Sequence, residues 1–296
     1  MIRKRKALAT GLILVVVWLI WNKGSLGLTR VDDGPQLEVA SAVMMDAETG
    51  KWLYRSHAKE PLPPASMSKM MTEVLVLEST RSGDVGWDDL VMASDYAAHV
   101  GGAGMGLAEG SKTSVKRLFN AMAIHSANDA AVSLAEYVAG TEAEFVVRMN
   151  KKAAEIGLSA KTRFANATGL PSSDLEGFAT ASADYDTVMT AEDVAILGRY
   201  LIETYPEVLM VTKKQSADDS DKGPLQTTNE MLPGQRFGLK GNEGLKTGYT
   251  KSAGYCFTGS TVINGRRYIT VVMGASTAES RFTETKKLLD YAKEAA

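Results

Sequence analysis

The chain has 296 residues, 45% of them hydrophobic, so it is long enough to bury one large core or two smaller ones. Its 33 lysines and arginines nearly balance its 35 aspartates and glutamates, and the formal net charge of −2 gives no long-range field that would attract nucleic acid. Cys256 is the single cysteine, which excludes an intrachain disulfide and a zinc site built from cysteines. We therefore expect a globular protein with no nucleic-acid partner.

The first 25 residues have the features of an export signal. Basic residues from Arg3 to Lys6 precede a largely apolar run from Ala7 to Trp21. The run is shorter than the roughly 20 residues of an ordinary membrane span, yet no clear cleavage site follows it. We expect residues 1–25 to be an uncleaved signal-anchor in the cell membrane, residues 26–36 a linker, and residues 37–296 one extracytoplasmic domain. Cleavage of the signal followed by secretion is the alternative.

Strand patterns stand at both ends of residues 37–296, and helical patterns lie between them. Two strands, over 38–48 and up to Ser56, are separated by a turn at Glu48-Thr49-Gly50. Apolar residues at helical spacing predict helices over 114–126, 128–140, 142–157 and 190–205. Strands 254–263 and 266–276 flank Asn264-Gly265, which predicts a type I′ hairpin, and a last helix covers about 279–295. We therefore expect an α+β domain whose terminal segments pair in one mostly antiparallel sheet, flanked by helices, with an inserted helical subdomain.

A serine and a lysine stand where a proline-led segment turns into an apolar helical pattern. Pro63 and Pro64 disfavour helix, and the pattern that starts at Met67 places Ser66 near a helix N-terminus. Ser66 and Lys69, three residues apart, then share one helix face. A buried lysine near another cation can take the proton of a serine, while a helix N-terminus offers an N–H to an oxyanion. A lone S-x-x-K is more often an N-cap serine with a lysine that reaches solvent.

Two further motifs follow in the chain. The tripeptide Ser126–Asn128 stands between two predicted helices, and Lys246–Gly248 opens a predicted edge strand before the terminal hairpin. Taken singly, the first would only end one helix and cap the next, and the second would only begin a solvated strand. S-x-x-K, S-x-N and K-T-G in this order form the motif set of penicillin-binding proteins and serine β-lactamases. Three short motifs in order are far more specific than any one of them.

With these motifs, the sequence resembles the low-molecular-weight penicillin-binding proteins that act as D-alanyl-D-alanine carboxypeptidases. The resemblance extends over roughly residues 38 to 293. It includes the stretches MMDAETGKWLY, PPASMSKMMT, SANDAAVSLAEYVAG, MNKKAAEIGL, FANATGL and EGLKTGYTKSAGYC. The resemblance implies that residues 37–296 are a DD-peptidase catalytic domain of the DD-peptidase/β-lactamase-like fold. The active site would lie between a core sheet and a helical region that carries the second motif.

The resemblance also implies roles for the motif residues. Ser66 would attack the carbonyl between the two terminal D-alanines of a peptidoglycan stem peptide, and Lys69 would accept its proton. Ser126 would relay a proton to the leaving amine. Asn128 would bind the peptide carbonyl of the substrate and help to hold Lys69. Lys246 would lower the proton affinity of Lys69 and favour the terminal carboxylate of the substrate.

Further residues complete the implied substrate site. Thr247 would hydrogen-bond the terminal carboxylate, and Gly248 would let the substrate backbone approach the strand closely. The N–H groups of Ser66 and Tyr249 would form the oxyanion hole. Arg281 stands before the last predicted helix, where this family often carries an arginine that binds the carboxylate. A surface arginine at a helix start is an equally good interpretation of this residue.

The remaining reactive residue types receive no catalytic role. His125 is a base by type, but a mechanism with Lys69 as the base leaves it no task. His57 and His99 lie far from the motifs and are expected at the surface. The histidine spacing offers no metal site, so we expect neither a metal nor another cofactor. Cys256 lies on a predicted central strand and is expected to be a buried, inert thiol.

The implied function is removal of the terminal D-alanine through an acyl-enzyme on Ser66, which also binds penicillin covalently. The expected partners are peptidoglycan stem peptides, β-lactam antibiotics and, through the N-terminal segment, the membrane. A serine β-lactamase is the first alternative, although no E-x-x-L-N stretch stands between the second and third motifs to supply a deacylating glutamate. A catalytically silent peptidoglycan-binding scaffold is the second alternative, and the intact motif residues count against it.

Two features depart from many members of this family. Many continue into a β-rich domain and an amphipathic C-terminal membrane helix, whereas this chain ends at Ala296, so membrane attachment is expected only through the N-terminus. Residues 171–187 lack the more usual acidic, histidine-containing approach to the next helix, and residues 216–226 have the composition of a polar loop. Both segments are expected to influence access of the substrate.

Overall fold

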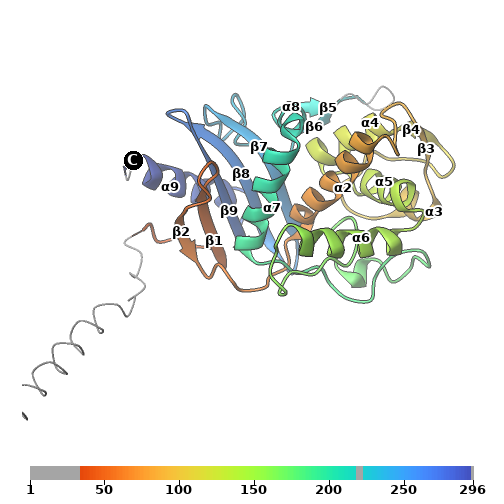
Figure 1. The fold of residues 1–296 in the computed structure, drawn as a ribbon, viewed down its shortest axis with the longest axis horizontal. Helices are drawn as coiled ribbons and strands as arrows, with labels where there is room; N and C mark the ends of the chain where they lie inside the picture. The colour runs from red at the N-terminus through yellow and green to blue at the C-terminus, as the bar shows by residue number, and fades with distance from the viewer. Residues whose placement is uncertain (1–33, 218–222, 295–296) are drawn as a thin grey trace, which may run out of the picture. The chain divides into compact units, whose positions relative to one another are not determined.

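The computed structural model describes residues 34–217 and 223–294. This part of the chain contains a five-stranded sheet (Figure 1). The strands lie in the order β2-β1-β9-β8-β7, and every neighbouring pair is antiparallel. The sheet therefore joins the first and last segments of the domain, as the sequence predicts, and β7 is an edge strand. Its members are β1 (Ser41–Asp46), β2 (Trp52–Ser56), β7 (Asn242–Thr250), β8 (Gly254–Ile263) and β9 (Arg266–Ala275).

Helices cover both faces of this sheet, so its central strands are buried on two sides. On β1, Ala42 and Met44 belong to the core under α9 (Ser280–Glu294), whereas Val43 belongs to the larger core shared with α7 (Ala191–Thr204). Neighbouring side chains point to opposite faces of a strand, so each face receives every second residue. Figure 1 shows α7 across one face of the sheet and α9 on the other. This arrangement explains why the strands are apolar runs rather than alternating patterns.

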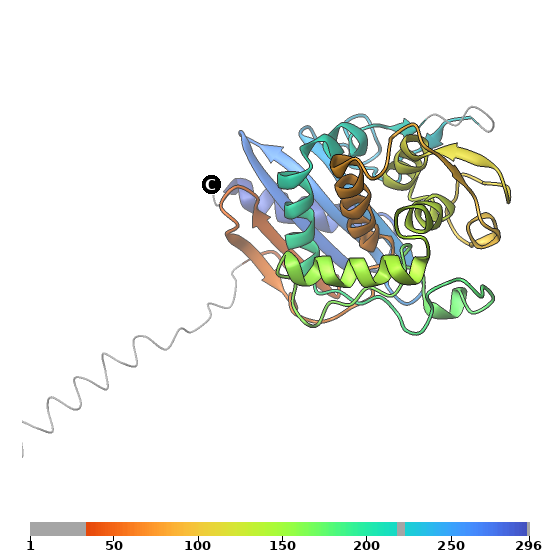
Figure 2. The same cartoon turned by 45° about the vertical axis from the view of Figure 1, so that its right-hand side comes forward.

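A helical region stands beside the sheet and is formed by the chain between β2 and β7 (Figure 2). Its central helix is α2 (Lys69–Ser82), which is buried from residue 69 to residue 77 because α5, α6 and α7 pack around it. The other members are α3 (Asp95–His99), α4 (Val115–Asn120), α5 (Asn128–Ala139), α6 (Glu142–Glu155) and α8 (Leu209–Thr212). Short elements complete it: β3 (Leu90–Met92), β4 (Lys112–Ser114), β5 (Ser216–Ala217), β6 (Leu225–Gln226), η1 (Ala65–Ser68), η3 (Ser172–Asp174) and η4 (Pro206–Val208).

Most predicted elements are present with slightly different ends. The helices predicted at 128–140, 142–157, 190–205 and about 279–295 correspond to α5, α6, α7 and α9. At the terminal hairpin, Asn264 and Gly265 have φ angles of 51° and 80°, the left-handed pair that a type I′ turn requires. The first strand begins later than predicted, because the pairing of β1 with β9 starts at Ser41.

The prediction of one continuous helix over 114–126 is wrong. Residues 112–114 pair in β4, α4 ends at Asn120, and η2 (Ala121–His125) is a π-helical turn. Ser126 follows it with a φ of 69°, in the left-handed region. Apolar periodicity does not distinguish an α-helical turn from a π-helical one, so the sequence pattern hides this break. The predicted polar loop at 216–226 likewise contains β5 and β6.

The predicted signal-anchor, residues 1–25, lies outside the described residues, as does most of the predicted linker. Among the residues that are described, no helix is both long and apolar enough to cross a membrane. Attachment through the N-terminal segment stays a prediction.

Candidate active site

The first motif lies where a 3-10 turn passes into α2. The turn η1 covers residues 65–68 and α2 begins at Lys69, so Ser66 precedes the helix proper. Ala65 has a φ of 47°, a left-handed conformation that is uncommon for a residue other than glycine and is often found at functional sites. The Nζ of Lys69 lies 2.8 Å from the Oγ of Ser66. The two side chains therefore meet, as their spacing predicts, although they do so across a junction of two helix types.

Lys69 is fully buried, and two further oxygens hold its amine. Its Nζ lies 2.6 Å from the Oδ1 of Asn128 and 2.7 Å from the carbonyl oxygen of Thr168. The Nδ2 of Asn128 donates to the carbonyl oxygen of Gly101, which orients the Oδ1 towards Lys69. A charged ammonium donates to all three neighbours. A neutral amine uses its two N–H groups on the two carbonyl oxygens, and its lone pair then faces Ser66 and can accept the hydroxyl proton.

The second and third motifs meet through their polar side chains. The Nζ of Lys246 donates to the Oγ of Ser126 at 2.8 Å, and both residues are buried. Ser126 reaches this position at the end of the π-helical turn, and Lys246 lies in the middle of β7. The Oγ1 of Thr247 lies 2.6 Å from the Oγ1 of Thr228. Because η1 packs against β7, the turn with the serine and the K-T-G strand are neighbours, and all three motifs belong to one site.

Burial lowers the pKa of both lysines in this site. Desolvation lowers the pKa of Lys69 well below the ordinary lysine value, and the positive charge of Lys246 lowers it further. Desolvation likewise lowers the pKa of Lys246 to about 8, and Arg281 acts in the same direction. A neutral Lys69 beside a charged Lys246 is the combination that activation of a serine by an amine requires.

Gly248 lies where the K-T-G strand passes close to the turn that carries Ser66. A Cβ atom on Gly248 would lie 2.7 Å from the carbonyl oxygen of Pro64 and 3.1 Å from the backbone nitrogen of Ser66. Position 248 therefore requires glycine because the backbone of residues 64–66 lies so close to it. The predicted close approach of a substrate backbone to Gly248 stays a prediction. Tyr249 is exposed, and its ring stacks on Tyr255 with 4.3 Å between centroids. An oxyanion hole formed by the N–H groups of Ser66 and Tyr249 also stays a prediction.

Arg281 lies in the first turn of α9 and not before the helix. It is only 9% exposed, so the interpretation as a surface arginine is wrong. Its Nη1 donates to the carbonyl oxygen of Gly248 at 3.4 Å, and its guanidinium lies 5.6 Å from the centroid of the Tyr255 ring. The arginine therefore contacts the K-T-G strand, and its binding of a carboxylate stays a prediction.

No motif marks the turn Asn166–Gly169, yet this turn completes the surroundings of Lys69. The Oδ1 of Asn166 accepts hydrogen bonds from the N–H and the Oγ1 of Thr168, at 3.1 and 2.8 Å, and from the N–H of Gly169 at 2.7 Å. These bonds form a tight turn whose Thr168 carbonyl points to the lysine. The sequence Asn-Ala-Thr-Gly is a turn signal that could have indicated it.

A buried carboxyl near both lysines is the second feature that no motif marks. Glu73 follows Lys69 by about one turn on α2 and is 1% exposed. Burial raises the pKa of Glu73 to about 7, although Lys246 and Lys69 act to lower it. A glutamate inside the apolar run after Lys69 is the signal that could have drawn attention to it.

The histidines lie apart from the lysine site. The side chains of His57 and His99 are each 61% exposed, which confirms the prediction of surface positions. The Nδ1 of His125 lies 2.8 Å from the carbonyl oxygen of Gln226, so this ring contacts the β6 segment. Within residues 34–217 and 223–294, no three side chains of the histidine, cysteine, aspartate or glutamate type gather as a metal site would require.

Cys256 is fully buried in β8, an internal strand of the sheet. Burial raises the pKa of its thiol to about 11, so the reactive thiolate is disfavoured. The prediction of a buried thiol is confirmed, and its lack of reactivity stays a prediction.

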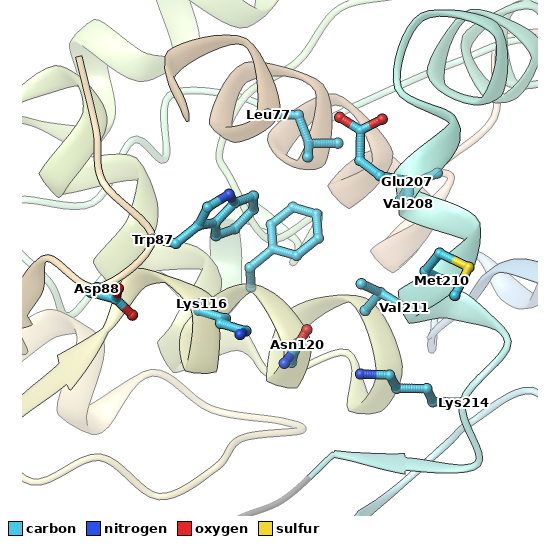
Figure 3. Close-up of a pocket in the computed structure, with 11 residues that line it drawn as sticks. Leu77, Trp87, Asp88, Lys116, Asn120, Glu207, Val208, Met210, Val211 and Lys214 are labelled. Carbon is cyan, nitrogen blue, oxygen red and sulfur yellow. The ribbon is translucent and has the colours of Figure 1, made fainter. Parts of the chain in front are cut away.

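A separate hollow of about 560 Å³ lies between α2, α4 and the segment around α8 (Figure 3). Figure 3 shows Trp87 at the left of this hollow and Met210 and Val211 at the right, with Lys116 and Lys214 along the lower side. The motif residues do not line it, so it is distinct from the site of the serine and the lysines. Its lining residues are Leu77, Trp87, Asp88, Lys116, Phe119, Asn120, Glu207, Val208, Met210, Val211 and Lys214.

An antiparallel sheet beside a helical region, with a serine next to a buried pair of lysines, defines the DD-peptidase class of fold and site. The model of the D-alanyl-D-alanine carboxypeptidase family, the S11 peptidases, matches residues 29–277 of this chain. The chain belongs to this family.

Known proteins resemble most of the chain. It is 39% identical over 259 residues to the D-alanyl-D-alanine carboxypeptidase DacF of Bacillus subtilis, and the match covers 86% of this chain and 62% of DacF. PBP3 of Streptococcus pneumoniae, a peptidoglycan synthesis regulatory factor, has a similar structure with a TM-score of 0.82 and 36% identity over 87% of this chain and 74% of that one. Penicillin-binding protein D2 of Listeria monocytogenes, solved in its ampicillin-bound form, gives a TM-score of 0.73 and 36% identity over 88% of this chain and 99% of that one. The chain spans about 62% of the length of the first curated relatives it matches.

Proposed function

We propose that the chain is a serine D-alanyl-D-alanine carboxypeptidase that removes the terminal D-alanine from peptidoglycan stem peptides. The observation that carries this proposal is the 2.8 Å distance between the Nζ of Lys69 and the Oγ of Ser66 at a fully buried lysine. Membership of the carboxypeptidase family supports the same reaction. We also propose that β-lactams acylate Ser66, since a relative was solved in an ampicillin-bound form.

In the proposed reaction, the Oγ of Ser66 attacks the carbonyl carbon between the two D-alanines while its proton moves to the neutral Lys69. The N–H groups of Ser66 and Tyr249 stabilise the oxyanion, an effect that typically contributes ~3–4 kcal/mol. The proton then reaches the leaving amine through Ser126, whose hydroxyl can donate and accept at the same time. The C–N bond breaks, D-alanine leaves, and water hydrolyses the ester that remains on Ser66.

The terminal carboxylate of the substrate would lie beside the K-T-G strand. Lys246 supplies a positive charge there, Thr247 a hydroxyl donor, and Arg281 a guanidinium that already contacts this strand. Asn128 would donate to the peptide carbonyl of the substrate through its amide group. The cations select a peptide with a free C-terminus, which is why we propose a carboxypeptidase.

The test uses the purified full chain and two substrates. Intact-mass spectrometry after incubation with benzylpenicillin is expected to reveal one adduct on Ser66, and a diacyl-L-Lys-D-Ala-D-Ala peptide is expected to release D-alanine. Ser66→Ala is expected to lose both reactions while it keeps the wild-type circular dichroism spectrum. A folded wild-type protein that forms no adduct and releases no D-alanine between neutral and mildly alkaline pH would contradict the proposal.

The lifetime of the adduct separates the alternatives. A long-lived adduct together with D-alanine release indicates the carboxypeptidase. Rapid turnover of penicillin indicates a serine β-lactamase, and the absence of both reactions indicates a silent peptidoglycan-binding scaffold.

We further propose that the catalytic domain is extracytoplasmic and is held at the cell membrane by an uncleaved N-terminal segment. The basic residues 3–6 followed by the apolar run 7–21 support this location. Membrane fractionation and the intact mass of the mature protein test it. A mature chain that lacks residues 1–25 in the soluble extracytoplasmic fraction would establish the secreted form instead.

A further inference from the structure

Glu73 is a buried carboxyl that the proposed reaction does not use. It lies on α2 four residues after Lys69, a spacing that places both side chains on one face of the helix. It is 1% exposed, and neither of its carboxyl oxygens has a hydrogen-bond partner among the described residues. An unpaired buried carboxyl destabilises a fold, so its presence in this helix calls for a function.

The nearby Asp129 on α5 gives a direct contrast. Asp129 also raises the pKa of Lys69 through its charge, but its two oxygens accept hydrogen bonds from the backbone N–H groups of residues 105–107. Both oxygens of Asp129 therefore have hydrogen-bond partners. Glu73 receives no such bonds; burial raises its pKa, and the charges of Lys246 and Lys69 lower it. The two carboxyls therefore differ in their partners, because the oxygens of Asp129 accept backbone hydrogen bonds and those of Glu73 do not.

The remaining charged groups near α2 are either part of this cluster or engaged elsewhere. The positive charge of Arg281 on α9 lowers the pKa of Lys246, and the charges of both lysines lower the pKa of Glu73. The other elements that pack on α2 turn their titratable groups to partners of their own. These include Glu142 of α6 with the Ala167 N–H, Lys152 of α6 with Glu78, Asp193 of α7 with Ser159 and Thr162, and His125 of η2 with the Gln226 carbonyl.

We propose that Glu73 is a positioning residue whose carboxylate balances one positive charge on the Lys69–Lys246 pair, so that Lys246 stays charged while Lys69 is neutral. This inference rests on the proposed acylation of Ser66. Two buried ammonium groups without an anion would repel each other, and both would tend to lose their protons. With Glu73 ionised, the buried cluster can keep the one cation that a substrate carboxylate needs.

The charge of Glu73 has a definite effect on pH dependence. Its carboxylate raises the pKa of Lys69 and of Lys246, opposing the effect of burial on each. Removing the carboxylate of Glu73 therefore lowers the pKa of both lysines. Lys69 then becomes a neutral base at lower pH, and Lys246 loses its charge at lower pH. Both limbs of a bell-shaped rate profile are therefore expected to move towards acid.

The experiment compares the rate of Ser66 acylation by benzylpenicillin between pH 5 and 10 in the full-length wild type and in three variants. Glu73→Gln is expected to move both limbs to lower pH by about one unit or more, a tenfold change in the neutral fraction of Lys69 on the acid side. Glu73→Asp keeps the charge and is expected to keep the wild-type limbs at a reduced maximum rate. Glu78→Gln, on the same helix but paired with Lys152, is the matched control and is expected to leave the profile unchanged.

A Glu73→Gln variant with wild-type limbs and only a lower maximum would overturn the inference, because it would reveal a purely structural role. If that variant does not fold, carbon-13 NMR of labelled glutamate carboxyls in the wild type decides. The inference expects one carboxyl that titrates between pH 5 and 9 and shifts when Ser66 is acylated, and the absence of such a carboxyl contradicts it. Failure of the wild type itself to be acylated contradicts the proposed function instead, so the two failures are distinguishable.

Discussion

Lys246 on β7 donates a hydrogen bond to Ser126 at 2.8 Å, although 120 positions separate the two residues in the chain. The bond joins the strand that would hold the substrate carboxylate to the hydroxyl that would relay a proton. The hydrogen bond therefore links the amine at position 246 to the hydroxyl at position 126.

Replacement of Lys246 tests the charge on β7. We expect Lys246→Met to slow Ser66 acylation tenfold or more and to raise the KM for the peptide, because the carboxylate partner and the bond to Ser126 are lost. The positive charge of Lys246 lowers the pKa of Lys69, so its removal is expected to shift the acid limb of acylation to higher pH. Stopped-flow acylation over a pH series measures this shift. Lys251→Met, at an exposed lysine just beyond β7, is the control, and an equal effect there would contradict the assignment.

The pH dependence of substrate binding in the wild type is a second test. The pKa of Lys246 is lowered to about 8, so the lysine is charged below this pH and loses its charge above it. Binding of a carboxylate needs the charged form, and the KM for a D-Ala-D-Ala peptide is therefore expected to rise as the pH passes through about 8. A substrate whose C-terminus is amidated should lack this rise. A KM that stays constant up to pH 10 would count against Lys246 as the carboxylate partner.

Gly248→Ala tests the close approach of β7 to the serine turn. The new Cβ would lie 2.7 Å from the Pro64 carbonyl oxygen, so the backbone that carries Ser66 must move. We expect acylation to fall at least tenfold and the free energy of unfolding to fall by ~1–3 kcal/mol, as in other overpacked cores. Urea unfolding and acylation rates measure the two effects. Gly177→Ala is the control, because a Cβ there meets no described atom within 4 Å.

Replacement of Asn166 tests the turn that places the Thr168 carbonyl oxygen next to the Nζ of Lys69. Asn166→Ala removes the acceptor of three hydrogen bonds, and we expect a loss of about 1–3 kcal/mol in the free energy of unfolding together with slower acylation. Asn166→Asp keeps the acceptor oxygen and is expected to recover part of both losses. Differential scanning calorimetry and penicillin acylation give the two readings. Equal behaviour of the two variants would argue against the turn as the source of the effect.

Local patterns predicted the elements whose geometry depends on neighbours in the chain. Ser66 and Lys69 are three residues apart, and this spacing brings their side chains together even though a 3-10 turn replaces the expected start of the helix. Asn264-Gly265 predicted its hairpin because both residues tolerate a positive φ. The π-helical turn before Ser126 escaped prediction, since the same apolar residues suit an α-helix as well.

The sequence by itself determined the family, the helices α5, α6, α7 and α9, the terminal hairpin and the motif residues, because each of these depends on short-range spacing and residue type. Tertiary structure alone decided what surrounds the motifs: the Thr168 carbonyl at Lys69, the backbone of Pro64 against Gly248, and the buried position of Arg281. It also placed Glu73 beside two lysines, one of them from a distant strand. The physical reason is that desolvation and charge coupling depend on which segments pack together, and no local pattern records that packing.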